Sequence, residues 1–473
     1  MTNTKLFDYL QSMNSYELNR FQKFVQSPYF NEDENIVRLV GELLPLLKQK
    51  IAQQTDEKSI WKKVFGNKRF AQQTFNRLLS DTVKQVEQFL VTDALNRNPI
   101  SNKIALLEVL NQRRLDKHFP ELHRFTTQKV KDITVKNADC YYQEFQLHQL
   151  QNNFIENQNQ RTTDKNLQQI FTSLDVFYFI HKLKFYAAAL HYGSFLSEQN
   201  EAALIHETIA ETEKPQYKTI AHLQAYRTVV LTFLEHENDN HFKQLVSLIQ
   251  YNSPQFSHLE LQSLLSFAIN HCIRKINMGN ADFLRELFHL YQYALNKKLL
   301  LDERNQLSQW EYKNIVTTAL RVKEFKWTEK FLTTFKTQLP PTERENAFTF
   351  NMARYYFAVK KYDSVLTLLQ RVEYSDIFYQ LDAKCTLLKT YYEIGEALPI
   401  HSLKDSFRIL LRRKKHITEQ QKANYLNLLK FTIRLHKTNV RNHKDLQQLK
   451  NEITTTQNIA DKNWLLEKLN ELM

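Results

Sequence analysis

The sequence predicts an all-α protein in which an N-terminal helical bundle is followed by an α-solenoid of stacked helix hairpins. The first observation is that only five of the 473 residues are glycine, whereas average usage near 7% gives roughly thirty-three. Few residues can therefore supply the positive-φ turns that β-hairpins need. The second is that apolar residues recur every three or four positions, as on one face of a helix. The third is a repeat in the second half of the chain.

The same composition excludes several classes of functional site. No two glycines lie within twenty residues of each other, so no GxGxxG or GxxxxGK phosphate-binding loop is present. The sequence also lacks HxxxH, HExxH, GxSxG and HRD motifs. Cys140, Cys272 and Cys385 are far apart, which predicts buried, reduced thiols. We therefore expect no cofactor, no metal site and no enzymatic activity.

Residues 1–98 are predicted to form the N-terminal helical bundle. Asn14 can cap the helix that follows it, and Glu17 can reach back to complete a capping box. Apolar stripes predict further helices over 36–47, 60–65 and 70–96. The sequence Arg97-Asn98-Pro99 is the first expected boundary.

Residues 99–216 are predicted to be a middle region of long helices, with a polar loop over 157–165. Residues 217–473 are predicted to form the solenoid. Nine apolar residues recur 37 positions later: Ile315, Val316, Ala319, Leu320, Val322, Phe325, Phe331, Leu332 and Phe335 precede Met352, Ala353, Tyr356, Phe357, Val359, Tyr362, Leu368, Leu369 and Val372. A period near 37 to 40 indicates antiparallel helix pairs that stack on one another.

Each repeat is expected to contain two helices joined by a tight turn. The turns are Val322-Lys323-Glu324-Phe325 and, 37 positions later, Val359-Lys360-Lys361-Tyr362. Two further capping boxes are expected to open later helices: Thr342 with Glu345, and Thr418 with Gln421.

The string Met352 to Val365 resembles a tetratricopeptide repeat, although Phe357 stands where that family has glycine. The likeness covers about 217–436 and implies a scaffold function. The string Phe24 to Asn31 is similar to an uncharacterised bacterial family of helical proteins, and this likeness implies no activity.

The tetratricopeptide likeness implies that the first helix of each pair lines a binding groove. Asn314 and Asn351 occupy the same place in successive repeats, beside Lys313 and Arg354. Repeated amides can clamp the backbone of an extended peptide. The alternative is that they are ordinary solvated polar residues. We therefore expect a non-catalytic scaffold that binds a protein or peptide partner.

The net charge of +13 is concentrated near the C-terminus. Residues 397–450 contain thirteen Lys or Arg and three acids, a net charge of +10. Two basic ridges are predicted on neighbouring helices: Lys404, Arg408, Arg412 and Lys415 on the first, and Lys430, Arg434, Lys437 and Arg441 on the second. Such ridges suit nucleic acid, bound without sequence preference, or an acidic protein segment. The alternative is a solvated basic surface.

No apolar run approaches the roughly 18 residues of a membrane span. The N-terminal residues lack the apolar core of a signal peptide. We therefore expect a cytoplasmic protein without membrane insertion. The sequence leaves open the oligomeric state and the identity of the partner.

Overall fold

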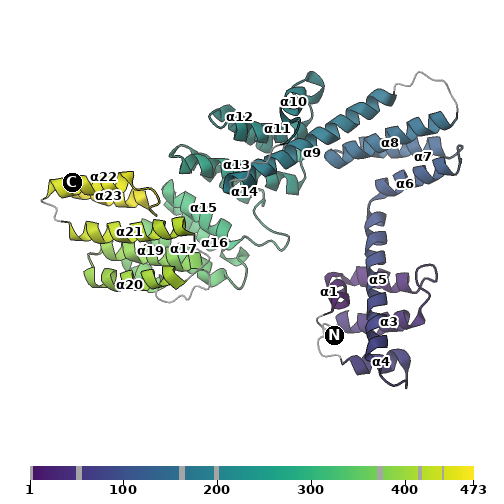
Figure 1. Ribbon diagram of the computed structural model, residues 1–473, viewed down its shortest axis with the longest axis horizontal. Helices are drawn as coiled ribbons and strands as arrows, with labels where there is room; N and C mark the ends of the chain where they lie inside the picture. The colour runs from purple at the N-terminus through teal and green to yellow at the C-terminus, as the bar shows by residue number, and fades with distance from the viewer. Residues whose placement is uncertain are drawn as a thin grey trace. The chain divides into compact units, whose positions relative to one another are not determined.

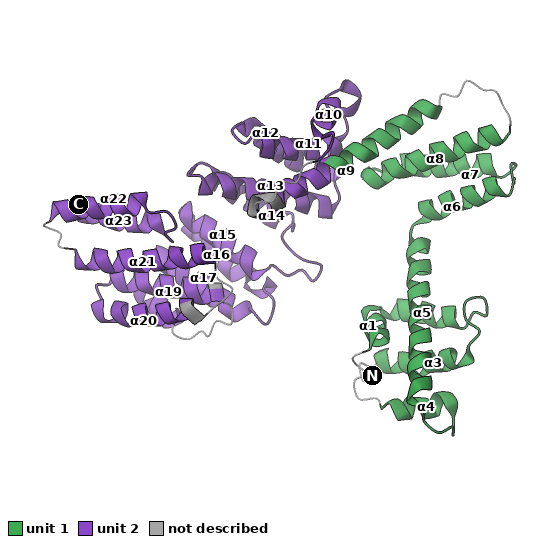
Figure 2. Ribbon diagram, in the orientation of Figure 1, with its two compact units in different colours: residues 1–182 green, residues 183–473 purple. Residues whose placement is uncertain are grey.

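The computed structural model describes residues 4–48, 56–158, 166–196, 202–369, 377–413, 418–438 and 442–473. These residues form 23 α-helices, and their only β interaction is an isolated bridge between Leu301 and Leu307. The predicted all-α class is confirmed. The chain divides into two compact units, residues 1–182 and 183–473 (Figure 2). The predicted boundaries after residues 98 and 216 stay predictions.

The first unit contains eight helices and the start of a ninth, which crosses the boundary between the units (Figure 1). These helices are α1 (Lys5–Ser12), α2 (Ser15–Val25), α3 (Glu34–Lys48), α4 (Glu57–Phe65), α5 (Gln72–Arg97), α6 (Pro99–Gln112), α7 (Phe119–Lys131), α8 (Ala138–Asn157) and α9 (Asn166–Leu196). The expected loop over 157–165 lies mostly outside the described residues.

Two apolar cores are found among the described residues of the first unit. Helices α1 to α5 share one core, in which Phe21 and Phe75 are fully buried. Helices α6, α7 and α8 share the other, where Phe119 stacks on Phe154 with ring centroids 4.3 Å apart. The long helix α5 contributes its N-terminal two thirds to the first core, because its apolar stripe faces α1, α2 and α3.

The second unit contains the remaining helices. They are α10 (Ile205–Glu211), α11 (Ala221–Leu234), α12 (Asp239–Tyr251), α13 (His258–Asn277), α14 (Phe283–Asn296), α15 (Gln309–Arg321), α16 (Phe325–Phe335), α17 (Arg344–Ala358), α18 (Tyr362–Leu369), α19 (Ile377–Glu393), α20 (Ala397–Arg413), α21 (Glu419–Lys437), α22 (His443–Thr455) and α23 (Lys462–Leu472).

Most helices of the second unit pack as hairpins. The pairs are α11 with α12, α13 with α14, α15 with α16, α17 with α18, and α19 with α20. The first helices of successive pairs also contact one another, so α15, α17, α19 and α21 form a row. Each helix thus packs mainly on its neighbours in sequence, as in repeat proteins.

The turns inside four hairpins share one backbone conformation. The second residue after the first helix has a positive φ in each, at Gly279, Lys323, Lys360 and Gly395. Both lysine turns close in the same way: the residue after each lysine donates its N–H to a carbonyl five residues back, at 3.0 Å after Lys323 and 2.8 Å after Lys360. These are the two turns predicted from the 37-residue offset, and α16 and α18 begin at Phe325 and Tyr362 as expected.

Two of the three expected capping boxes are present. Asn14 and Thr418 each accept from the backbone three residues on, and the paired Glu17 and Gln421 bond back. The box expected at Thr342 is wrong, because α17 begins two residues later at Arg344 without a side-chain cap. The last of the nine repeated apolar pairs is Phe335 with Val372, and Val372 lies outside the described residues.

The three cysteines are unbonded and buried. Burial raises the pKa of the thiols of Cys140, Cys272 and Cys385. Among the helices that the structure describes, none combines the length and the hydropathy that crossing a membrane requires.

Candidate interaction surface

The two asparagines predicted to clamp a peptide lie in different environments. Asn314 is exposed on α15, whereas Asn351 on α17 is fully buried. The side-chain amide of Asn351 donates to the carbonyl oxygen of Ala347 within its own helix, at 2.8 Å. Helix α17 is packed between α15 and α19, which covers this position. The expected role of Asn351 is therefore corrected: a fully buried amide cannot reach a peptide.

The two cations predicted beside them bind to other helices of the array. Lys313 forms an ion pair with Asp382 of α19, and the hydroxyl of Tyr425 on α21 donates to the same carboxylate at 3.1 Å. Arg354 donates to the hydroxyl oxygen of Thr317 on α15. These contacts join the first helices of different hairpins, so Lys313 and Arg354 hold the row together.

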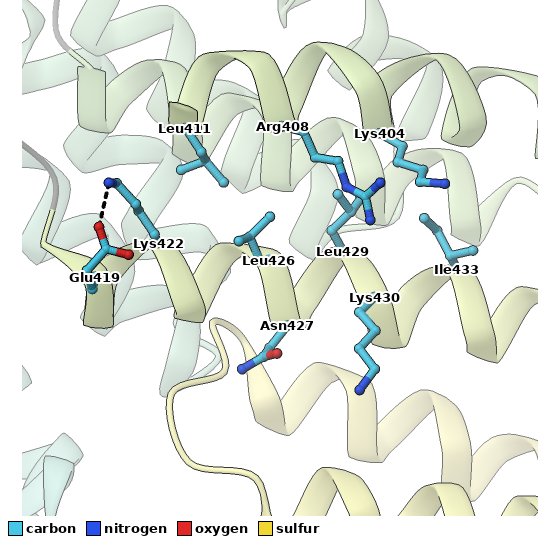
Figure 3. A pocket seen from close by; sticks show the side chains of 10 residues that line it. All are labelled: Lys404, Arg408, Leu411, Glu419, Lys422, Leu426, Asn427, Leu429, Lys430 and Ile433. Atoms are coloured by element: carbon cyan, nitrogen blue, oxygen red, sulfur yellow. Dashed lines mark hydrogen bonds and ion pairs between the residues drawn. The ribbon is translucent and has the colours of Figure 1, made fainter. Parts of the chain in front are cut away.

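An open groove lies between α20 and α21 (Figure 3). Its volume is about 760 Å³. Four leucine and isoleucine side chains form its apolar part, and four cations, one amide and one acid complete the lining. The apolar residues are Leu411, Leu426, Leu429 and Ile433, and the polar ones are Lys404, Arg408, Lys422, Lys430, Asn427 and Glu419.

The cations of the groove differ in their pairing. Lys422 bonds to Glu419 at 2.7 Å within the first turn of α21. Lys404, Arg408 and Lys430 have no ion-pair partner among the described residues, and Arg408 and Lys430 are exposed. In Figure 3, Lys404 and Arg408 extend from α20, whereas Lys430 lies on the side of α21 away from α20. Positive charge therefore borders an apolar strip on both sides.

The structure brings the two predicted ridges together only in part. Lys404, Arg408 and Lys430 line the groove, whereas Arg434 pairs with Glu452 of α22. The hydrogen bond from Arg434 lowers the pKa of Glu452. Arg434 lies one helical turn beyond Lys430, and at that turn the carboxylate of Glu452 is close enough to pair with it.

The other ridge residues contribute less. Lys437 is exposed on α21 but does not line the groove. Lys415 and Arg441 lie outside the described residues, and so does the side chain of Arg412. Phe431 is buried in the C-terminal core, so no base can stack on it.

Sequence reasoning missed the apolar half of the groove. Leu426 and Ile433 are spaced seven residues apart, as for one face of a helix, and Lys422 precedes them on the same face. This second, partly exposed apolar stripe beside the buried one was the available signal. A helix face that only contacts water is typically polar, so an apolar stripe on that face indicates a contact surface.

A second groove lies between α14 and α16. Its volume is about 410 Å³, and Trp327, Phe331 and Phe335 line it together with Gln292 and Asn296. The indole of Trp327 stacks on Phe331 with centroids 5.3 Å apart, and Phe331 stacks on Phe335 at 4.9 Å. Much of this aromatic surface therefore packs against itself.

Elsewhere in the described ranges, no three His, Cys, Asp or Glu side chains are grouped as metal binding requires. Comparison with known proteins gives no relative: no family model, curated protein or solved structure matches this chain. Function is therefore inferred from the geometry of the chain itself.

Proposed function

We propose that this chain is a non-catalytic cytoplasmic scaffold that binds a partner protein through its helical-repeat unit. The observation that carries the proposal is the open groove between α20 and α21, where an apolar strip lies between cations that have no ion-pair partner among the described residues. Leu426, which belongs to this strip, is exposed, and covering it with a partner is favourable because apolar surface is removed from water. Protein-binding grooves combine such apolar surface with charges that select the partner.

The repeat architecture supports the same proposal. Hairpins α13/α14 to α19/α20 share a turn conformation, and the turns at Lys323 and Lys360 keep the 37-residue offset of the tetratricopeptide-like repeat. Stacked helix hairpins of this kind form a solenoid, whose extended surfaces serve to bind other proteins. On this view the solenoid presents the groove, and the contacts of Lys313 and Arg354 join its hairpins to one another.

The proposal is tested by selecting peptides from a random display library on the immobilised full-length chain. We expect a family of related sequences that bind saturably in solution, measured by fluorescence anisotropy. Failure to enrich any sequence family, with no saturable binding by single clones, contradicts a protein-binding function.

Nucleic-acid binding is the second candidate, because Lys404, Arg408 and Lys430 lack acidic partners in the described chain and can contact phosphates. Phe431 is buried and Tyr425 bonds to Asp382, so such binding would rest on charge alone. Titration of labelled DNA and RNA at 50 and 200 mM salt decides this. A fall in affinity of orders of magnitude between the two salt concentrations would support it.

A further inference from the structure

The outward face of α21 lacks the cover that the earlier first helices have. Helices α15, α17 and α19 each pack closely on the second helix of their own hairpin. Helix α22, which follows α21, packs mainly on α23, and it is joined to α21 by the ion pair of Arg434 with Glu452; α23 also contacts α21. In the described part of the chain, the exposed Leu426 and the half-buried Ile433 therefore line the groove beside α20 without a helix over them. This is a place where a further helix can pack.

The dimensions of the strip suit a short helix. Lys422, Leu426, Leu429 and Ile433 follow one face of α21, and at 1.5 Å per residue the stretch from Lys422 to Ile433 is about 16 Å long. A ligand helix of about three turns matches that length. Leu411 closes the groove from the side of α20.

The charges around the strip specify what kind of helix fits. Lys404 and Arg408 border it on the α20 side, and Lys430 borders it on the other (Figure 3). The single acid of the lining, Glu419, is already paired with Lys422 at one end. The groove is thus complementary to an apolar stripe with carboxylates along both edges.

We propose that the α20/α21 groove binds an acidic amphipathic helix of a partner protein. Its leucine-like stripe covers Leu426 and Ile433, and its Asp or Glu residues pair with Arg408 and Lys430 in the manner of helix-in-groove recognition. This inference rests on the proposed protein-binding function and names the partner's chemistry. Phosphate groups cannot form hydrogen bonds or ion pairs with an apolar strip, and burying their charge against it is unfavourable. The same groove therefore suits a peptide better than nucleic acid.

The test uses three synthetic peptides of about fourteen residues and the full-length chain, with binding measured by fluorescence anisotropy. The first peptide has leucines at i, i+3, i+4 and i+7 with glutamates on both edges of the stripe. In the second every glutamate is replaced by lysine, and the third has the composition of the first in scrambled order. We expect the first to bind at least about tenfold more tightly than either control. Equal binding of the first and scrambled peptides overturns the inference.

Two groove variants locate the binding site. Arg408→Glu with Lys430→Glu, and separately Leu426→Asp, are each expected to weaken binding of the first peptide at least about tenfold. The matched control is Lys437→Glu with Lys444→Glu, which changes the net charge equally at exposed positions outside the groove. Circular dichroism of every variant verifies the fold. Equal weakening by the control pair contradicts a defined groove.

The two proposals fail in different ways. If display-selected peptides bind the groove variants as tightly as the unaltered chain, the chain is a protein-binding scaffold and the inference about this groove is wrong. If no peptide binds saturably, the proposed function is wrong and the inference falls with it. A self-associated chain that dissociates on Arg408→Glu with Lys430→Glu, seen by analytical ultracentrifugation, assigns the groove to a second copy and also overturns the inference.

Discussion

Two lysines occupy a backbone conformation that glycine adopts at lower cost. Lys323 and Lys360 have φ values of 63° and 61°, whereas Gly279 and Gly395 occupy the equivalent place in neighbouring hairpins. A side chain at a left-handed φ costs about 1 kcal/mol, because its Cβ crowds the backbone. The scarcity of glycine therefore leaves conformational strain in two of the hairpin turns.

Replacing Lys323 or Lys360 by glycine is expected to stabilise the fold by about 1 kcal/mol each, since the strain at the left-handed position is removed. The measurement is urea unfolding of the full chain, followed by circular dichroism. Lys330→Gly is the control: this residue is exposed inside α16, so the same change should destabilise by about 1 kcal/mol. If both lysine-to-glycine variants unfold at lower urea concentration than the unaltered chain, the two turns are not strained.

A buried histidine makes a second residue-scale feature. His271 stacks on Phe242 with ring centroids 5.1 Å apart, and neither of its ring nitrogens has a hydrogen-bond partner among the described residues. Burial, together with the charges of Arg274 and Lys275, lowers the pKa of His271 to about 4. The imidazole is therefore neutral in the folded chain near pH 7.

This histidine predicts a loss of stability in acid. An unfolded histidine has a pKa near 6.5. Below that pH this histidine is protonated in the unfolded chain, whereas in the folded chain His271 stays neutral until a lower pH. Its contribution is complete above about pH 6.5 and declines as the pH falls toward 4, by about 3 kcal/mol in all. His271→Phe should reduce the pH dependence of the free energy of unfolding in urea over this range. The exposed control His289→Gln should leave the slope of that free energy against pH unchanged. An unchanged slope in the phenylalanine variant would be the contrary result.

At the scale of elements, polar contacts along the row of first helices connect hairpins that are distant in sequence. Lys313 on α15 reaches Asp382 on α19, and Tyr425 on α21 bonds to the same carboxylate. Both partners of the ion pair are mostly shielded from water. Removing one of them leaves a poorly solvated charge, which costs more than an exposed ion pair contributes.

A double-mutant cycle of Lys313→Ala and Asp382→Ala is expected to give a coupling free energy of about 1 kcal/mol. The exposed pair Arg285 and Glu324, whose atoms are 3.0 Å apart, is the matched control and should give less than about 0.5 kcal/mol. Thermal or urea unfolding supplies the four free energies of each cycle. Similar couplings for the two pairs would show that the shielding of Lys313 has no energetic effect.

At the scale of the whole molecule, each unit has its own pattern of packing. The first unit has apolar cores such as that around Phe21 and Phe75, and it also exposes apolar side chains such as Val91 and Phe171. The second spreads its buried residues along a series of hairpins and ends in the core shared by α19 to α23. The excess of positive charge falls on that last part, where the groove with Arg408 and Lys430 is open. Long-range attraction would bring an acidic partner toward this end.

Much of this organisation was predictable from the sequence, because it depends on residues close together in the chain. Helical periodicity located the helices, the 37-residue offset located the turns at Lys323 and Lys360, and local side-chain bonds at Asn14 and Thr418 marked helix starts. Each of these features is decided within a few residues. The all-α class follows from them together.

The candidate site depended on contacts that the sequence does not contain. Asn351 and Asn314 share a repeat position, yet only the packing of α17 between α15 and α19 decides that Asn351 is buried. Likewise, the packing of α20 beside α21 places Arg408 and Leu426 in the same groove, and Arg434 forms an ion pair with Glu452 of α22. Local periodicity determines which residues share a face of one helix. Which faces meet is decided by the packing of helices distant in sequence, and therefore by the tertiary structure alone.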